Sequence, residues 1–300
     1  MVQSSKIQNV TLAGGGVLGS QIAMQAAFFG FHVSIYDKQA EGARERVQKL
    51  VPVYAEFFKK SVADTQALAD SIQYHTELAA AVENAQLLIE ALPEAIDLKN
   101  TFYQELNRVA PAEMIVASNS STLTPSQMVA ATGRPKQFLA LHFANHIWQR
   151  NTAEIMGTAQ TDPAVFDSVV QFARDIHMIA LPLHKEQAGY ILNTLLVPFL
   201  DAAMHLYAND IADPHTVDKT WMLATGAPMG PFAIMDAVGI NTLLNINQQK
   251  AKAGSELAAK VMTKLQKEFV EQGRMGIETG KGFYDYPNPA FQSPHFLKND

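Results

Sequence analysis

The stretch Gly14-Gly-Gly16-Val-Leu-Gly19 follows a short apolar run, Val10-Thr-Leu-Ala13, and opens a segment with helical periodicity. In a strand–turn–helix unit the first glycine permits a tight turn, the second lets the backbone reach a pyrophosphate, and the third lets helix and strand pack closely. The helix N-terminus adds N–H groups and a positive dipole. This context predicts a dinucleotide-binding site. The residues expected to contact the dinucleotide here are Gly14, Gly16, Val17, Leu18 and Gly19.

An acidic residue, Asp37, stands at the end of the next apolar run, His32–Tyr36. A carboxylate at this place can accept hydrogen bonds from the ribose hydroxyls of NAD and would repel the 2′-phosphate of NADP. Lys38 follows directly and would soften that repulsion, and a strand-end turn is the structural alternative for Asp37. The pattern favours NAD as the cofactor.

The composition is that of an ordinary globular chain. Its 300 residues suggest about two domains, and 48% of them are hydrophobic. A net charge of −6 argues against a nucleic-acid partner, because the phosphate backbone requires a basic face. The absence of cysteine excludes disulfides, thiolate metal sites and a cysteine nucleophile. The first residues lack the apolar core of a secretory signal, so we expect a cytoplasmic protein with no membrane partner.

Apolar runs of strand length alternate with helix-compatible segments through the first part of the chain. This alternation predicts an α/β fold with a Rossmann-type, doubly wound, mostly parallel sheet. From about residue 186 only helical periodicity remains. We therefore expect an NAD-binding domain at 1–185, with a helical insertion at about 39–82, and an all-helical domain at 186–300. The runs lie at residues 7–13, 32–36, 85–91, 113–118, 138–143, 153–157 and 177–183.

Helix boundaries can be placed in both domains. The insertion is expected to hold helices over 41–62 and 64–70, whose mixture of lysine, arginine and aromatic residues is read as a solvated amphipathic face, with an anion-binding surface as the alternative. In the second domain, 190–208 is expected to form a buried helix. Asp213-Pro214 is typical of a helix start and Thr225-Gly226 of a helix end.

Polar residues follow several of the apolar runs, where ligands bind in a doubly wound sheet. His142 lies within the fifth run and Glu154 within the sixth. A histidine in a strand is usually a hydrogen-bonded core residue, but a neighbouring carboxylate would fix its tautomer and make it a base near neutral pH. Such a base could take the hydroxyl proton while hydride passes from an alcohol to a nicotinamide, with Ser121 and Asn193 holding the oxygen.

Other chemistries lack their motifs. His146 follows His142 at a helical spacing, but the chain has no H-E-x-x-H sequence and no carboxylate cluster, so we expect no metal site. It also has no G-x-S-x-G sequence of the kind that places a hydrolase nucleophile.

Taken together, these motifs resemble those of short-chain L-3-hydroxyacyl-CoA dehydrogenases, also called 3-hydroxybutyryl-CoA dehydrogenases. The resemblance runs from end to end, and several of the matching segments are specific to that family. They are Gly14–Gly19, Glu90–Glu94, Asp97–Lys99, Ser118–Ser121, Leu141–Phe143, Glu154, Gly189–Asn193, Gly226–Phe232 and Thr279–Tyr284.

The resemblance implies a role for each of these segments. His142 would be the general base in oxidation and the acid in reduction, with Glu154 as its partner. Ser121 and Asn193 would contact the reacting oxygen or the thioester, and Asn145 would also bind substrate. The helical domain would form a homodimer contact and close the cleft. The further residues implied at the cofactor are Ala91, Glu94, Lys99 and Asn119.

One segment departs from the family. Members continue His-Phe-Phe-Asn-Pro after the fifth strand, whereas this chain reads His142-Phe-Ala-Asn145-His-Ile-Trp148-Gln-Arg150. The spacing from His142 to Glu154 is kept. We therefore expect an altered loop at the acyl pocket, in which Arg150 could pair with a substrate carboxylate.

The function predicted from these observations is NAD-dependent interconversion of an L-3-hydroxyacyl-CoA and a 3-oxoacyl-CoA. The first alternative keeps the chemistry and replaces the thioester by a free 3-hydroxy acid, of the gulonate or carnitine type. The alternative from another class is a non-catalytic dinucleotide-binding relative, against which the joint presence of His142, Glu154, Ser121 and Asn193 argues.

Overall fold

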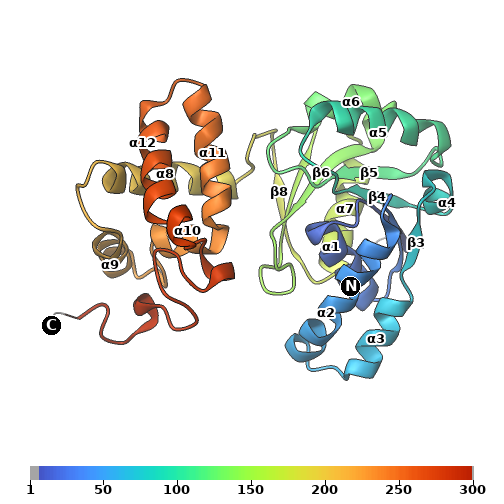
Figure 1. Cartoon of the computed structure of the whole chain (residues 1–300). Helices are drawn as coiled ribbons and strands as arrows, with labels where there is room; N and C mark the ends of the chain where they lie inside the picture. The colour runs from blue at the N-terminus through green and yellow to red at the C-terminus, as the bar shows by residue number, and fades with distance from the viewer. Residues whose placement is uncertain (1–6, 299–300) are drawn as a thin grey trace. The chain divides into compact units, whose positions relative to one another are not determined.

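The computed structural model of the chain describes residues 7–298. It divides into two compact units, Met1–Ile191 and Leu192–Asp300, which are coloured from blue to yellow and from yellow to red in Figure 1. The division falls a few residues after the boundary proposed from the sequence, in the segment that joins the last strand to the next helix.

The first unit is built on an eight-stranded sheet with the order β3-β2-β1-β4-β5-β6-β7-β8. β7 is antiparallel to β6, and the other neighbouring pairs are parallel. The chain order reverses at β1, so the sheet is doubly wound, as predicted. The strands are β1 Asn9–Ala13, β2 His32–Tyr36, β3 Gln73–His75, β4 Leu87–Glu90, β5 Ile115–Ser118, β6 Phe138–Phe143, β7 Thr152–Gly157 and β8 Ile179–Leu183.

Helices cover both faces of this sheet, which is why its central strands are almost continuously apolar. One buried cluster packs α1, α2, α3 and α7 against the sheet, and another packs α4, α5 and α6. In Figure 1, α5 and α6 accordingly lie across the sheet from α1 and α7. The helices are α1 Val17–Phe28, α2 Ala40–Phe57, α3 Val62–Asp70, α4 Leu78–Val82, α5 Ile96–Val109, α6 Pro125–Thr132 and α7 Pro163–Asp175.

The predicted insertion differs from the structure in two ways. The helix expected over 41–62 ends at Phe57, and Lys59 has a left-handed φ of 53° that stops it. Ser61 then caps α3 by accepting a hydrogen bond from the N–H of Asp64. The sequence analysis also missed β3, because this edge strand has only three residues and none of them is fully buried.

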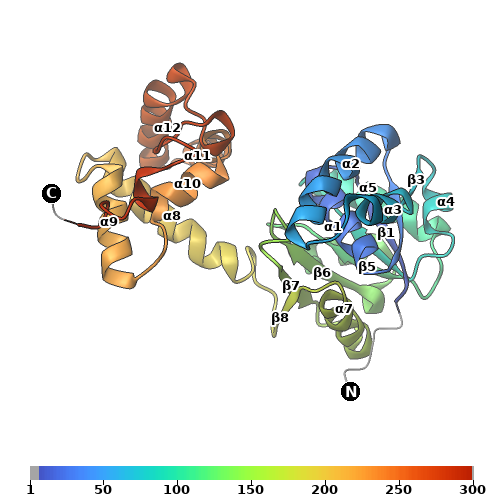
Figure 2. The ribbon, with the colours of Figure 1, turned by 90° about the horizontal axis from the view of Figure 1, so that it is seen from below.

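The second unit contains helices throughout, as predicted (Figure 2). Asp213 caps α9 through the N–H of Thr216, and Gly226 ends it at a φ of 73°, so both predicted boundaries are confirmed. The expectation of a wholly buried first helix holds only for its second half, because Leu195 is 68% exposed. The helices are α8 Leu192–Ala208, α9 Pro214–Thr225, α10 Pro231–Val238, α11 Ile240–Lys252 and α12 Glu256–Glu268.

Two buried carboxylates organise the loops of the second unit. Asp218 accepts hydrogen bonds from the N–H groups of Phe232 and Ala233 at the start of α10. Asp236 accepts them from Phe283 and Tyr284 at 2.7 and 2.9 Å. A Cβ on Gly282 would lie 2.0 Å from the Asp236 carboxylate. The glycine-containing segments Gly226–Phe232 and Thr279–Tyr284 are therefore fixed to the buried carboxylates of this unit.

Within residues 7–298, no helix has both the length and the apolar character needed to cross a membrane.

Candidate active site

The glycine turn has the shape that a dinucleotide requires. Gly14 has a φ of 102°, and a Cβ there would lie 2.7 Å from the carbonyl oxygen of Ala91. A Cβ on Gly19 would lie 1.9 Å from the carbonyl oxygen of Gly14. A Cβ on Gly16 would meet no atom within 4 Å. Contacts within the protein therefore exclude side chains at Gly14 and Gly19, whereas Gly16 faces open space into which a pyrophosphate fits.

Asp37 is fixed beside this turn at the end of β2. Its carboxylate accepts hydrogen bonds from the N–H of Gly15 at 2.7 Å and from the N–H of Gln39 at 2.8 Å. Both oxygens keep a further lone pair, so the carboxylate can still accept from ribose hydroxyls. Asp37 and Lys38 both line the adjoining cavity, whose volume is about 810 Å³.

A second cavity, of about 270 Å³, continues from the first. The two share Gly16, Ala91 and Leu92 as lining residues. Together they form a groove that runs from Asp37 across the glycine turn to Ser121, and we call it the dinucleotide groove. Every residue predicted at the cofactor lines one of these cavities except Lys99. The predicted residues on the groove are Gly14, Gly16, Val17, Leu18, Gly19, Asp37, Ala91, Glu94 and Asn119.

Lys99 lies instead in a buried polar cluster at the end of β4. Its ammonium contacts the Glu90 carboxylate at 2.6 Å, and both side chains are almost fully buried. Glu90 also accepts hydrogen bonds from the hydroxyls of Tyr103 and Ser118 and from the N–H of Leu92. The donors compensate the buried charge. The direct role of Lys99 at the cofactor stays a prediction.

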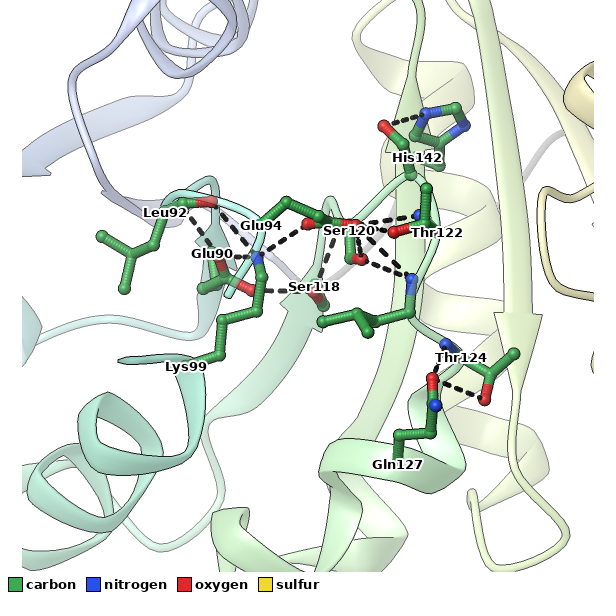
Figure 3. Close-up of polar contacts among 12 residues, drawn as sticks. Glu90, Leu92, Glu94, Lys99, Ser118, Ser120, Thr122, Thr124, Gln127 and His142 are labelled. Carbon is green, nitrogen blue, oxygen red and sulfur yellow. Dashed lines mark hydrogen bonds and ion pairs between the residues drawn. The ribbon is translucent and has the colours of Figure 1, made fainter. Parts of the chain in front are cut away.

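Glu94 connects this cluster to the groove, as Figure 3 shows. It accepts hydrogen bonds from the Ser120 hydroxyl at 2.5 Å and from the hydroxyl and N–H of Thr122. The Lys99 ammonium lies 3.4 Å away. Burial alone would raise the pKa of Glu94, but these hydrogen bonds and the lysine charge bring it below its usual value. Glu94 is therefore a carboxylate at neutral pH.

A chain of three polar side chains stands at the far end of the groove. The Ser121 hydroxyl lies 3.1 Å from Nε2 of His142, and Nδ1 of His142 lies 3.1 Å from the Glu154 carboxylate. His142 and Glu154 face each other because β6 and β7 pair antiparallel with these residues in register. Only 7% of His142 and 4% of Glu154 are exposed. This arrangement, which we call the Ser–His–Glu relay, can exchange a proton with a ligand bound in the groove.

The segment after β8 also touches the relay. The Tyr190 ring stacks on the imidazole of His142, with ring centroids 4.5 Å apart, and its hydroxyl donates to the carbonyl oxygen of Ser120. The N–H of Ile191 donates to the second oxygen of Glu154 at 2.9 Å. The sequence analysis included these residues in the segments Glu90–Glu94, Ser118–Ser121 and Gly189–Asn193, but it gave no role to Glu90, Tyr190 or Ile191. The alignment of Glu90 with Ser118 at two strand ends was the available signal for the cluster.

The loop that departs from the family packs within the first unit through Trp148. Trp148 contacts Tyr54 of α2, with ring centroids 5.5 Å apart, and packs against the main core. Asn145 and Arg150 are exposed in the loop. Asn193 belongs to α8 in the second unit, so its predicted approach to the relay stays a prediction, as do the roles predicted for Asn145 and Arg150.

Comparison with family models identifies both parts of the chain. The model described as "3-hydroxyacyl-CoA dehydrogenase, NAD binding domain" matches residues 9–187. The model for the C-terminal domain of the same family matches residues 189–286.

Full-length relatives support the same grouping. Human mitochondrial hydroxyacyl-coenzyme A dehydrogenase is 31% identical over 290 residues, covering 93% of this chain and 91% of that one. A probable 3-hydroxybutyryl-CoA dehydrogenase of Bacillus subtilis is 30% identical, with 94% and 98% covered. A solved structure of a diketoreductase, described with dual catalysis of dicarbonyl compounds, is 48% identical, with a TM-score of 0.89 and 93% and 99% covered. The chain is an NAD-dependent oxidoreductase and belongs to the 3-hydroxyacyl-CoA dehydrogenase family.

Proposed function

We propose that this protein interconverts an L-3-hydroxyacyl-CoA and the corresponding 3-oxoacyl-CoA. The observation that carries the proposal is the Ser–His–Glu relay at the end of the dinucleotide groove. Its imidazole is buried, is held at both nitrogens, and lies where a secondary alcohol could meet the cofactor. The thioester is the part of the substrate supported by the family relatives alone.

The proposed chemistry assigns one task to each side chain. In oxidation, Nε2 of His142 takes the proton of the 3-hydroxyl group, and in reduction it returns that proton to the oxygen. Glu154 holds Nδ1 and offsets the positive charge of the protonated ring. The Ser121 hydroxyl hydrogen-bonds the reacting oxygen, and Asn193 is proposed as a second donor. NAD, when bound, supplies the hydride acceptor for the hydrogen that leaves C3.

The diketoreductase supports a second candidate function, reduction of dicarbonyl compounds that carry no CoA. Its 48% identity exceeds the 31% of the human thioester enzyme. A 3-oxo group beside another carbonyl presents the same reacting oxygen to His142 in both substrate classes. A free 3-hydroxy acid is a third substrate form, in which exposed Arg150 would hold the carboxylate.

The assembly is also part of the proposal. We expect a homodimer formed through the second unit, since several large apolar side chains on its helices and in the loop between α8 and α9 are exposed. They include Leu195 at 68%, Ile211 at 59% and Leu223 at 58% exposure. Light scattering of the purified protein would report the molecular mass. The cytoplasmic location expected from the sequence remains a prediction.

The experiment that tests the function is NADH consumption by the purified protein with four substrates: acetoacetyl-CoA, acetoacetate, a dicarbonyl ester and a 3-oxo sugar acid. Each is run with the wild type and with His142→Ala, and NADPH replaces NADH in a parallel series. Reduction of the thioester that falls at least about 100-fold in the variant supports the main proposal. Turnover of the ester alone favours the second candidate. Binding of NADH without any turnover would contradict both and indicate the non-catalytic alternative.

A further inference from the structure

The junction between the two units begins with two residues in a left-handed conformation. Gly189 has a φ of 80° and Tyr190 a φ of 54°. Residues other than glycine rarely adopt this left-handed backbone conformation, and a bulky residue keeps it only where its surroundings hold it there. Tyr190 as a whole residue is 1% exposed. The strain therefore coincides with a side chain that is tightly packed.

Tyr190 contacts one member of the relay, His142, and the residue next to another, Ser121. Its ring covers one face of the His142 imidazole, at 20° between the planes. Its hydroxyl donates to the carbonyl oxygen of Ser120 at 2.8 Å, one residue before Ser121. The backbone conformation of Tyr190 also sets the direction of the next N–H, that of Ile191, which donates to Glu154 at 2.9 Å. The two residues Tyr190 and Ile191 thus contact His142, Glu154 and the backbone carbonyl directly before Ser121.

The contacts of Tyr190 restrain the tilt of the His142 ring, which the hydrogen bonds of the relay restrain only weakly. The hydrogen bonds of His142 to Ser121 and Glu154 act along the edges of the imidazole. Such bonds fix the direction of the nitrogens but resist tilting of the ring weakly, because hydrogen-bond geometry tolerates wide angles. A flat ring stacked against the imidazole face resists tilting through van der Waals contact.

The hydroxyl of Tyr190 remains a donor. Burial, and secondarily the charges of Glu154 and the carboxylates at the end of β4, raise the pKa of Tyr190 far above its usual value. The phenol therefore stays protonated across the pH range in which the relay would work, and the hydrogen bond to Ser120 persists.

We propose that Tyr190 is a positioning residue for the Ser–His–Glu relay. Its ring holds the plane of the His142 imidazole by stacking, and its hydroxyl positions Ser121 through the carbonyl of Ser120. Its backbone conformation directs the N–H of Ile191 toward Glu154. The inference rests on the proposed function, because it assigns Tyr190 to the same reaction. It assigns no contact with substrate or cofactor. Misplacing a general base by about 1 Å can cost about 100-fold in rate.

The test uses two substitutions that separate the parts of the side chain. Tyr190→Phe keeps the stacked ring and removes the hydroxyl, whereas Tyr190→Leu removes the ring. The matched controls are Tyr54→Phe and Tyr54→Leu, because Tyr54 is also fully buried and donates its hydroxyl to Gln25 at 2.8 Å. The controls remove equivalent packing at a place in the first unit outside the relay.

The expected result is a division between kcat and KM. We expect kcat to fall about 30- to 100-fold in Tyr190→Leu, with KM for NADH unchanged within about twofold, and we expect Tyr190→Phe to recover most of the loss. The Tyr54 variants should lower the melting temperature as much as their Tyr190 counterparts while keeping kcat. If the Tyr54 and Tyr190 variants lose activity only in proportion to stability, Tyr190 is a packing residue and the inference is wrong.

A second readout does not depend on turnover. The ¹⁵N chemical shifts of the His142 ring, assigned with His142→Gln, report whether Nδ1 and Nε2 keep their hydrogen bonds. We expect them to shift in Tyr190→Leu and to stay unchanged in Tyr54→Leu. If the wild type reduces no substrate, the proposed function fails, yet these shifts still decide whether Tyr190 positions His142. Unchanged shifts in Tyr190→Leu would overturn the inference even in an active enzyme.

Discussion

Buried carboxylates occur in both units, but their partners differ. In the first unit, Glu90 faces the ammonium of Lys99 and Glu154 faces the imidazole of His142. In the second unit, Asp218 and Asp236 accept hydrogen bonds from backbone N–H groups and tyrosine hydroxyls. Burial alone therefore does not mark a catalytic carboxylate. We infer that the carboxylate beside the Lys99 cation is a fixed support, and we propose that the one beside the His142 imidazole belongs to a proton relay. The carboxylates bonded to backbone N–H groups join loops.

The largest effect should follow from breaking the permanent ion pair. Lys99→Met leaves the Glu90 carboxylate buried without its cation, which we expect to lower the free energy of unfolding by about 3–5 kcal/mol. Chemical denaturation followed by circular dichroism measures this change. The double variant Glu90→Gln/Lys99→Met removes both charges and should recover part of the loss. A double variant as unstable as Lys99→Met would show that the pair is not a fixed support.

The next effect concerns the titratable partner. Glu154→Gln keeps the size of the side chain but removes the charge and lets an amide face Nδ1 of His142. We expect kcat to fall at least about 100-fold, because the imidazole loses its oriented tautomer and its counter-charge. Steady-state oxidation of NADH measures this, with denaturation as the control. Loss of stability comparable to that of Lys99→Met, with kcat retained, would make Glu154 a support like Glu90.

A smaller effect is expected in the second unit. The Asp236 carboxylate accepts hydrogen bonds from two backbone N–H groups. Asp236→Asn replaces one of the two accepting oxygens by an NH₂ group, so one N–H loses its acceptor. Leaving one buried donor unpaired should cost about 1–3 kcal/mol of stability. The exposed neighbour Asp285 supplies the matched control, Asp285→Asn, which should change little. NADH affinity, measured by fluorescence titration, should be unaffected by either variant, and a large loss in Asp236→Asn would contradict the contrast between the units.

The smallest expected effect is in the pH dependence of stability, where the contributions of Asp236 and Glu94 change in opposite directions as the pH rises. Burial raises the pKa of Asp236 above its usual 3.8, so its contribution to stability falls as the pH rises from 3.8 through the raised value. The pKa of Glu94 is below its usual 4.5, so its contribution is present above 4.5 and is lost as the pH falls through the lowered value.

Melting temperatures measured from acid to neutral pH distinguish the two carboxylates. The advantage of the wild type over Asp236→Asn should shrink as the pH rises, and its advantage over Glu94→Gln should grow. The Glu94 trend should be weak, because 35% of its side chain is exposed and solvent screens its charge. Trends of the same sign would mean that the two carboxylates do not differ as described.

Several parts of the fold followed from local patterns. The glycine turn, the end of the second strand at Asp37 and the caps at Asp213 and Gly226 are confirmed because each depends on residues near in sequence. The edge strand β3 and the early end of α2 could not be predicted. Three residues carry too little periodicity to indicate a strand, and the left-handed turn at Lys59 has no glycine to announce it.

The site divides in the same way. Its glycines, Asp37, His142 and Glu154 could be singled out from position relative to the apolar runs. Lys99 was expected at the cofactor, and the structure adds its buried ion pair with Glu90, which the sequence did not indicate. Trp148 was expected in the altered loop at the acyl pocket, and it packs against Tyr54. In both cases the contact joins a helix to a strand end or a loop, and only the tertiary structure brings the two together.

The sequence by itself determined the alternation of strands and helices, the dinucleotide turn and the family to which the chain belongs. These depend on the spacing of residue types along the chain, which reading the sequence discloses directly. The tertiary structure decided which partner each buried carboxylate received, because partners such as Glu90 and Ser118, or Glu154 and Ile191, are separated by 28 and 37 residues. The strand register and the path of the chain after β8 bring these partners within hydrogen-bonding distance, and neither can be read from a short stretch of sequence.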